Sequence, residues 1–166
     1  ATLINSSKKN ITLIGMPFSG KSTIGKELSE KLGYNFIDID NYIEDKYNMK
    51  LPNIINKFGN DKFKIIEEEA MLEMSGTKNI FSTGGSVIYS EKGMEHLKNI
   101  SNVVFLNTDL EVLKSRINNN NMKERGIVFK EGQTFDTLFS ERTPLYEKFS
   151  TNIINCKSLD IMEIVN

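Results

Sequence analysis

The sequence predicts a three-layer α/β domain built around a parallel sheet. Short apolar runs alternate with segments of helical period along the chain, and this alternation is typical of strands covered by helices on both faces. Residues 15–22 read GMPFSGKS, a G-x-x-x-x-G-K-S/T phosphate-binding loop that follows an apolar run and precedes a helical segment. With 166 residues, 39% of them hydrophobic and 26% charged, the chain has the size and composition of one globular domain over residues 1–166.

The first predicted elements surround this loop. Residues 11–14 form an apolar run bounded by polar residues, which predicts a buried strand. Residues 21–32 carry an apolar side chain at every fourth position of one face, which predicts a helix, and Gly33 is suited to end that helix. Residues 35–40 then predict a second strand that ends in acidic residues.

Three helices are predicted next, over residues 41–50, 51–58 and 61–74. Pro52 stands near the start of the second of these helices, where a proline fits because the first turn needs no N–H donor. Gly59 separates the second helix from the third. The three helices together form a largely helical segment between the second and third strands.

The second half of the chain continues the alternation. The predicted elements are a strand over 79–82, a helix over 91–98, a strand over 103–106, a helix over 109–117, a helix over 134–149 interrupted at Pro144, a strand over 152–155 and a helix over 158–165. Residues 118–133 are polar and rich in Asn, Lys and Gly, without a core-building period. A segment of that length inside a compact domain predicts a mobile functional loop.

Composition narrows the classes of function. The net charge of −1 gives no basic excess for nucleic acid or an anionic membrane, and no apolar stretch approaches the roughly 20 residues that span a bilayer. The N-terminal residues lack the apolar core of a signal peptide. One histidine, His96, and one cysteine, Cys156, cannot form an intrachain disulfide, a Ser-His-Asp triad or a zinc site. We therefore expect a cytoplasmic protein.

The phosphate-binding loop predicts a nucleotide site. Backbone N–H groups at the start of a helix, together with the helix dipole, favour the oxygens of a phosphate group. Lys21 is expected to reach the β- and γ-phosphates, and the Ser22 hydroxyl is expected to bind Mg²⁺. An ordinary glycine-rich turn would not explain why lysine and serine stand together at the start of the helix.

Ligands of an open parallel sheet bind beyond the carboxyl ends of its strands. The phosphate-binding loop, the pair Asp38 and Asp40, and the pair Gly84 and Gly85 follow the first, second and third strands. Asp38 and Asp40 are expected to point to the same side of their strand, because strand side chains repeat every two residues. Such carboxylates suit two tasks, holding Mg²⁺ and orienting a hydroxyl nucleophile, and the alternative is that they cap the next helix.

Arginines follow near the polar loop. Phosphoryl transfer needs cations around the transferred group, and a closing lid often supplies them. Arg125 lies inside the loop, Arg116 just before it and Arg142 on the helix after it. The alternative for each is a solvated surface residue, and for Arg142 also a local pair with Asp136 or Glu141.

The chain resembles the shikimate kinase family across nearly its full length. The residues that carry the resemblance occur in one order: GMPFSGKSTIG at 15–25, FIDID at 36–40 with Tyr42, Ile43 and Glu44, GNDKFKIIE at 59–67, GGS at 84–86, Leu113 with Arg116, Arg125 with Gly126, and RTPLY at 142–146. Several spaced motifs in one order are much more specific than the phosphate-binding loop alone.

The resemblance implies a P-loop kinase of the nucleoside-monophosphate-kinase type, with a five-stranded parallel sheet in the order 2-3-1-4-5. It implies a mobile lid at about 118–133 and an acceptor-binding helical segment at about 41–74. The implied reaction transfers the γ-phosphate of ATP, with Mg²⁺, to a hydroxyl of a small carboxylated metabolite, with shikimate as the first choice. The implied partners are small molecules only, without nucleic acid or membrane, and a monomer is expected.

The resemblance also implies roles for single residues. The catalytic residues would be Lys21, Asp40 and Arg125; the nucleotide-binding residues Gly15, Ser19, Gly20, Lys21, Ser22, Thr23 and Arg116; the acceptor-binding residues Asp40, Lys64, Gly84, Gly85 and Arg142; and the Mg²⁺ ligands Ser22 and Asp38. Arg116 would stack on the adenine, and Arg125 would close with the lid.

Four positions depart from the family pattern. Lys64 stands where the family has an arginine, Ser86 where it has a third glycine, Gly126 where it has the lid proline and Phe18 where it has a glycine. Lysine keeps the charge of arginine but loses its planar two-pronged geometry. Two alternatives therefore remain open: a related kinase with a different hydroxy acceptor, and a nucleotide-binding protein without kinase activity.

Overall fold

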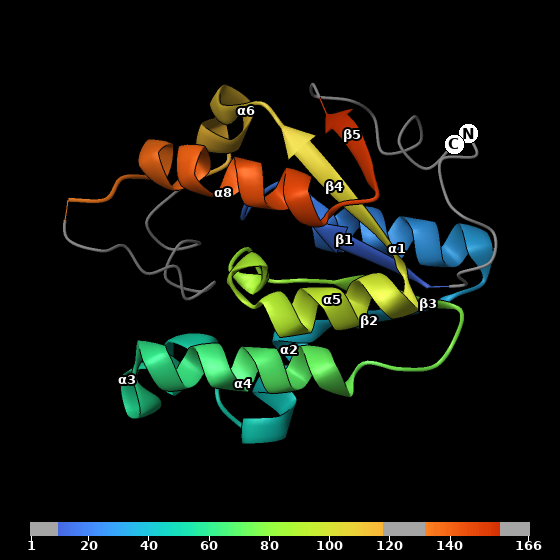
Figure 1. Ribbon diagram of the computed structural model, residues 1–166, viewed down its shortest axis with the longest axis horizontal. Helices are drawn as coiled ribbons and strands as arrows, with labels where there is room; N and C mark the ends of the chain where they lie inside the picture. The colour runs from blue at the N-terminus through green and yellow to red at the C-terminus, as the bar shows by residue number, and fades with distance from the viewer. Residues whose placement is uncertain (1–9, 118–131, 157–166) are drawn as a thin grey trace.

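Five parallel strands form the central sheet, in the order β2-β3-β1-β4-β5 (Figure 1). The computed structural model describes residues 10–117 and 132–156. The strands are β1 (Ile11–Ile14), β2 (Asn35–Asp38), β3 (Asn79–Ser82), β4 (Asn102–Thr108) and β5 (Asn152–Cys156). This arrangement confirms the predicted α/β fold and the strand order that the family resemblance implied.

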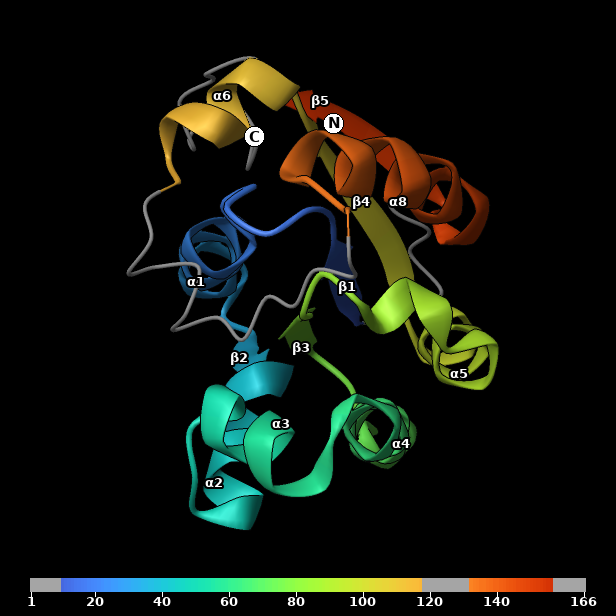
Figure 2. The same ribbon diagram turned by 90° about the vertical axis from the view of Figure 1, so that its left-hand side faces the viewer.

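Helices cover both faces of the sheet (Figure 2). They are α1 (Lys21–Leu32), α2 (Ile39–Tyr47), α3 (Leu51–Phe58), α4 (Asn60–Glu73), the short 3-10 helix η1 (Val87–Tyr89), α5 (Glu91–Ile100), α6 (Leu110–Ser115) and α8 (Phe135–Phe149). In the two views α1 lies on one face and α5 and α8 lie on the other, while α2, α3 and α4 gather near the β2 edge. The described elements therefore form three layers.

The side chains of the central strands divide between these two faces. Leu13 of β1 and Leu106 of β4 pack in one apolar cluster with Ile24 of α1. Ile14 and Phe105, their neighbours in the same strands, pack in a second cluster together with residues of α5 and α8. Successive strand side chains point to opposite faces. A strand buried on both faces therefore needs the continuous apolar run that the sequence shows.

The second strand is shorter than predicted. It ends at Asp38, and α2 begins at Ile39, so Asp40 lies in the first turn of a helix. The Asp38 carboxylate caps this helix by accepting a hydrogen bond from the backbone N–H of Asn41 at 3.2 Å. The prediction that Asp38 and Asp40 share one side of a strand is therefore wrong, because strand geometry stops before Asp40.

Most other predicted elements agree with the structure. The bounds of α1 and β3 are those predicted, whereas α8 continues through Pro144, where an interruption was predicted. The buried side chains of Tyr146 and Phe149 hold this part of α8 to the core. The expected helix over 158–165 and most of the expected lid, including Arg125, lie outside the described residues. Within the described ranges no helix is long and apolar enough to cross a membrane.

Candidate functional site

The phosphate-binding loop joins β1 to α1 and places Lys21 at the centre of the site. The Lys21 side chain is 6% exposed, and its ammonium group donates hydrogen bonds to the carbonyl oxygens of Gly15 and Met16, both at 2.8 Å. Gly20 has a left-handed backbone with φ 93° and no side chain that could cap α1. No side chain therefore caps the start of α1, and a helix N-terminus of this kind favours an anionic ligand.

Gly15 fits the loop closely against the carboxyl end of β4. A Cβ atom at Gly15 would lie 2.9 Å from the carbonyl oxygen of Leu106 and 3.1 Å from the Oγ of Ser19. Any side chain there would push the loop away from β4 and narrow the space above it. The loop and the start of α1 therefore form a concave backbone surface that fits the phosphates of a nucleotide.

Phe18 explains one departure from the family pattern. Its backbone is left-handed, with φ 72°, which glycine adopts at little cost and phenylalanine only with strain. The Phe18 ring is 6% exposed and packs against the Phe135 ring of α8 at a centroid distance of 6.4 Å. The Arg116 guanidinium donates a hydrogen bond to the Phe18 carbonyl at 2.7 Å. The buried ring and this hydrogen bond offset the backbone strain and tie the loop to α6 and α8.

Ser22 and Asp38 lie together below the phosphate-binding loop. The Ser22 hydroxyl donates a hydrogen bond to Asp38 Oδ2 at 3.0 Å, and the Ser82 hydroxyl lies 3.4 Å from it. No group of three or more His, Cys, Asp or Glu residues suited to a metal occurs in the described part of the chain. Mg²⁺ does not require such a group, because it keeps several waters and binds one or two carboxylates together with substrate phosphates. Ser22 and Asp38 therefore fit Mg²⁺ beside a bound nucleotide.

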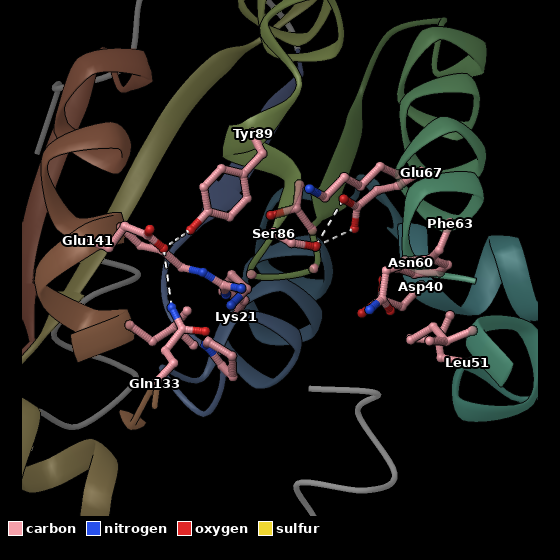
Figure 3. A pocket seen from close by; sticks show the side chains of 18 residues that line it. Lys21, Asp40, Leu51, Asn60, Phe63, Glu67, Ser86, Tyr89, Gln133 and Glu141 are labelled. Carbon is pink, nitrogen blue, oxygen red and sulfur yellow. Dashed lines mark hydrogen bonds between the residues drawn. The ribbon is translucent and has the colours of Figure 1, made fainter. Parts of the chain in front are cut away.

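A cavity of about 220 Å³ lies between the phosphate-binding loop, α2, α4, η1 and α8 (Figure 3). The side chain of Lys21 lines it together with the five residues predicted to bind the acceptor, which are Asp40, Lys64, Gly84, Gly85 and Arg142. These residues come from distant parts of the sequence. The fold thus brings Lys21 to the predicted acceptor residues. Thr23 is exposed on α1 and does not line the cavity.

Two glycines allow charged groups to approach the loop after β3. A Cβ atom at Gly84 would lie 2.8 Å from Asp40 Oδ1, and a Cβ atom at Gly85 would lie 2.8 Å from an Arg142 guanidinium nitrogen. The carbonyl of Gly85 accepts a hydrogen bond from the buried Tyr146 hydroxyl at 2.6 Å, which fixes the loop. Side chains at these two positions would displace the carboxylate or the guanidinium from the cavity.

Arg142 is a buried cation whose hydrogen-bonding capacity is not fully used. It is 8% exposed, and its Nε is buried without a hydrogen bond to any described residue. Among the described residues no ion pair joins Arg142 to Asp136 or Glu141. Asp136 pairs with Lys114 at 3.2 Å, and Glu141 accepts a hydrogen bond from Tyr89 at 2.5 Å. A buried guanidinium of this kind fits the carboxylate of a ligand.

The sequence-based assignment missed Glu67. Its side chain is 4% exposed and lines the cavity from α4, and both of its carboxylate oxygens accept hydrogen bonds from the Ser86 hydroxyl, at 3.0 and 2.9 Å. Burial, followed by the nearby charge of Asp40, raises the pKa of Glu67 to about 7. The signal in the sequence was its spacing: Lys64 and Glu67 are three residues apart on one helix and so share a face.

Comparison with known protein families identifies relatives of the chain. The family model described as "Shikimate kinase" matches residues 17–166. The shikimate kinase of Staphylococcus aureus (strain MSSA476) is 34% identical over 161 residues, which cover 97% of this chain and 92% of that protein. The shikimate kinase of strain JH9 is 41% identical over 115 residues, which cover 69% of this chain and 66% of that protein.

Among solved structures, shikimate kinases also resemble the chain. The shikimate kinase from Acinetobacter baumannii in complex with shikimate superimposes with a TM-score of 0.83 at 27% identity, over 96% of this chain and 89% of that chain. The shikimate kinase of Aquifex aeolicus vf5 has a TM-score of 0.77 at 29% identity, over 94% of this chain and 91% of that chain. The thymidylate kinase of Candida albicans, at 15% identity and a TM-score of 0.56 over 95% and 88%, shares the fold.

The strain at Phe18 can be measured with two variants. Phe18→Ala and Phe18→Gly both lose the buried ring, so each is expected to lower the free energy of unfolding by about 2–4 kcal/mol. The Gly variant should be more stable than the Ala variant by about 1 kcal/mol, because only glycine adopts this left-handed backbone without strain. Urea unfolding measures both values. An Ala variant as stable as the Gly variant would contradict the strain.

The buried carboxyl of Glu67 predicts a specific dependence of stability on pH. Its pKa is raised from 4.5 to about 7 in the folded protein, so the folded state retains a proton that the unfolded state has lost. Stability is therefore lost as pH rises from about 4.5 to about 7 and changes no further above that. Glu67→Gln removes this loss, which amounts to about 3 kcal/mol in the free energy of unfolding.

Urea unfolding of the parent chain and of Glu67→Gln at pH 4.5 and pH 8 measures the difference. As pH rises from 4.5 to 8, the free energy of unfolding of the Gln variant should increase relative to that of the parent. Glu69→Gln, at an exposed position of the same helix, is the control and should show no such gain. If the free energies of unfolding of Glu67→Gln and the parent change with pH in parallel, the pKa of Glu67 is not raised in the folded protein.

Proposed function

The chain belongs to the shikimate kinase family, and we propose that it transfers the γ-phosphate of ATP to a hydroxyl of shikimate, forming shikimate 3-phosphate and ADP. The observation that carries this proposal is the single cavity lined by Lys21, Asp40, Lys64 and Arg142. In the reaction the acceptor oxygen forms a bond to the γ-phosphorus, the bond from this phosphorus to the β–γ bridging oxygen breaks, and the hydroxyl proton is lost.

The donor half of the site binds and orients the phosphates of ATP. Lys21 lines the cavity, and its ammonium group donates hydrogen bonds to two backbone carbonyls at 2.8 Å, so this cation lies at the loop where the β- and γ-phosphates are expected to bind. Ser22 and Asp38 would hold Mg²⁺, which would neutralise charge on the phosphate oxygens. Arg116 is tied to the loop through the Phe18 carbonyl, next to the expected adenine.

Asp40 is placed to act on the acceptor hydroxyl. It lies in the first turn of α2 and lines the same cavity as Lys21, and its carboxylate oxygens lie close to Gly84. A carboxylate in this position accepts the hydrogen bond of the attacking hydroxyl and takes its proton as the new bond forms. Gly84 permits this approach, because a Cβ atom there would meet the Asp40 oxygens.

Arg142 and Lys64 face the cavity from α8 and α4 and suit the carboxylate of the acceptor. Arg142 contributes a buried guanidinium whose Nε has no hydrogen bond to a described residue, and Lys64 contributes a second positive charge. An acidic acceptor with hydroxyl groups is complementary to this arrangement, since cations meet its carboxylate and carboxylates meet its hydroxyls. We further propose that Arg125 assists transfer from the lid.

We infer that the whole chain forms one domain that works as a cytoplasmic monomer, without nucleic acid or membrane partners. One continuous sheet carries the described elements, and the residues that line the cavity come from elements packed on that sheet. The free cysteine, Cys156, is buried, and burial raises the pKa of its thiol. These features suit a protein that needs neither a disulfide nor a second subunit to complete its site.

Release of ADP in the presence of Mg²⁺ and ATP tests the proposal, with shikimate compared against a panel of other hydroxy acids, sugars and nucleotides. We expect turnover with shikimate and a loss of at least about 100-fold in Lys21→Ala, because that variant removes the phosphate-binding ammonium. Turnover with another acceptor but not with millimolar shikimate would overturn the assignment of shikimate as the acceptor. Binding of ATP without phosphorylation of any acceptor would overturn the kinase activity.

Lys64→Arg tests the carboxylate contact. A guanidinium forms two parallel hydrogen bonds with a carboxylate where an ammonium acts as a point charge, so we expect KM for shikimate to fall about 3- to 10-fold with little change in kcat. Steady-state kinetics measures both constants. Lys62→Arg, the same exchange at an exposed position of α4, should leave KM unchanged. An equal or higher KM in Lys64→Arg would place the shikimate carboxylate elsewhere.

A further inference from the structure

Ser86 connects the loop after β3 to α4 through the Glu67 carboxylate. Its hydroxyl donates hydrogen bonds to Glu67 Oε1 at 3.0 Å and Glu67 Oε2 at 2.9 Å, and Figure 3 shows the two side chains pointing toward each other. Both residues line the cavity. A hydroxyl shared between both oxygens fixes the rotation of a carboxylate more firmly than a contact to one oxygen.

The backbone at Ser86 does not demand this residue. Its φ of −93° and ψ of 1° are accessible to residues with a side chain. This contrasts with Phe18, where the residue that replaces a family glycine has a left-handed backbone. What the serine adds at position 86, compared with a glycine, is therefore a hydroxyl group that contacts Glu67.

The surroundings of Glu67 place it among the charges of the acceptor cavity. Its carboxylate experiences the charges of Asp40 on α2, Lys64 on its own helix and Arg142 on α8, and it in turn acts on the Tyr146 hydroxyl of α8. Three cations, Lys21, Lys64 and Arg142, and three carboxylates, Asp40, Glu67 and Glu141, thus line one small space. An acceptor that carries one carboxylate and several hydroxyls has groups that complement both kinds of charge.

From this geometry we propose that Ser86 is a positioning residue for acceptor binding: its hydroxyl fixes the ionised Glu67 carboxylate so that this carboxylate accepts a hydroxyl group of the acceptor. The inference rests on the proposed function, because it names one side of the same acceptor cavity. It assigns a role to a residue that departs from the family glycine. It also makes acceptor binding sensitive to pH near neutrality.

The pH dependence follows from the competing effects on Glu67. Burial and the charge of Asp40 raise the pKa of Glu67, while the Ser86 hydroxyl and the charges of Arg142 and Lys64 lower it, with the result at about 7. Removing the Ser86 hydroxyl removes one stabilising contact of the ionised form. The pKa of Glu67 must then rise, and less of the carboxylate is ionised at pH 7.

The first test follows the titration of Glu67 by NMR in protein labelled with [δ-¹³C]glutamate. The signal of Glu67 is identified by its loss in Glu67→Gln, and its midpoint should lie near pH 7 in the parent chain. Ser86→Ala and Ser86→Gly should both raise the midpoint by about one pH unit, because a hydrogen bond to the charged form is lost. An unchanged midpoint would overturn the inference, whatever the acceptor is.

The second test measures KM for shikimate from pH 6 to pH 9. A rise of one unit in the pKa lowers the ionised fraction at pH 7 from about one half to about one tenth, so KM of Ser86→Ala should rise about fivefold there and approach the parent value at pH 9, with kcat little changed. An increase of KM that is equal at all pH values would indicate a merely structural role and overturn the inference.

Ser90→Ala is the matched control. Ser90 donates a hydrogen bond to Glu68 Oε2 at 2.6 Å, so it also links the segment after β3 to α4, but neither Ser90 nor Glu68 lines the cavity. This variant should change neither the Glu67 midpoint nor the pH profile of KM. Absence of turnover with shikimate in the parent chain would overturn the proposed function, whereas normal parent turnover with an unchanged profile in Ser86→Ala would overturn this inference alone.

Discussion

Parallel pairing of β1 with both β3 and β4 is the constraint on which the rest of the structure depends. Because all strands run in one direction, the carboxyl ends of β1, β2 and β3 meet at the same edge. The phosphate-binding loop, Asp38 and the Gly84–Gly85 pair each follow one of these ends. Neither half of the site would face the other if one of these strands ran in the opposite direction.

The fold must also stabilise two buried cations, Lys21 and Arg142. Backbone carbonyl groups and an aromatic ring surround them. The Lys21 ammonium rests on two carbonyl oxygens, while the Arg142 guanidinium packs over the Tyr89 ring at 5.5 Å and beside Gly85. Burying an isolated charge is costly, so such groups persist where dipoles, rings and opposite charges surround them. The cavity therefore contains both cations, which suit anionic groups, and carboxylates, which suit hydroxyl groups.

The sequence predicts most of the fold because its signals are local. The bounds of α1 and β3 follow from apolar spacing and glycine positions, and the ordered family motifs predicted the strand order. The β2–α2 boundary could not be predicted, because Ile39 suits both an alternating strand and the buried face of a helix, where it is 0% exposed. The hydrogen bond between Glu67 and Ser86 joins residues 19 positions apart, and no local pattern predicts such a contact. Arg125 lies outside the described residues and stays a prediction.

The central claim is that one cavity holds a phosphate donor and an acidic acceptor in reacting positions. A crystal structure with ADP, Mg²⁺ and shikimate tests it most directly. Shikimate should bind in the cavity, with its carboxylate at Arg142 and Lys64 and one hydroxyl at Asp40, facing Lys21. Shikimate bound elsewhere, or bound with its hydroxyls turned away from the phosphate-binding loop, would show that the cavity does not hold the two substrates in this way.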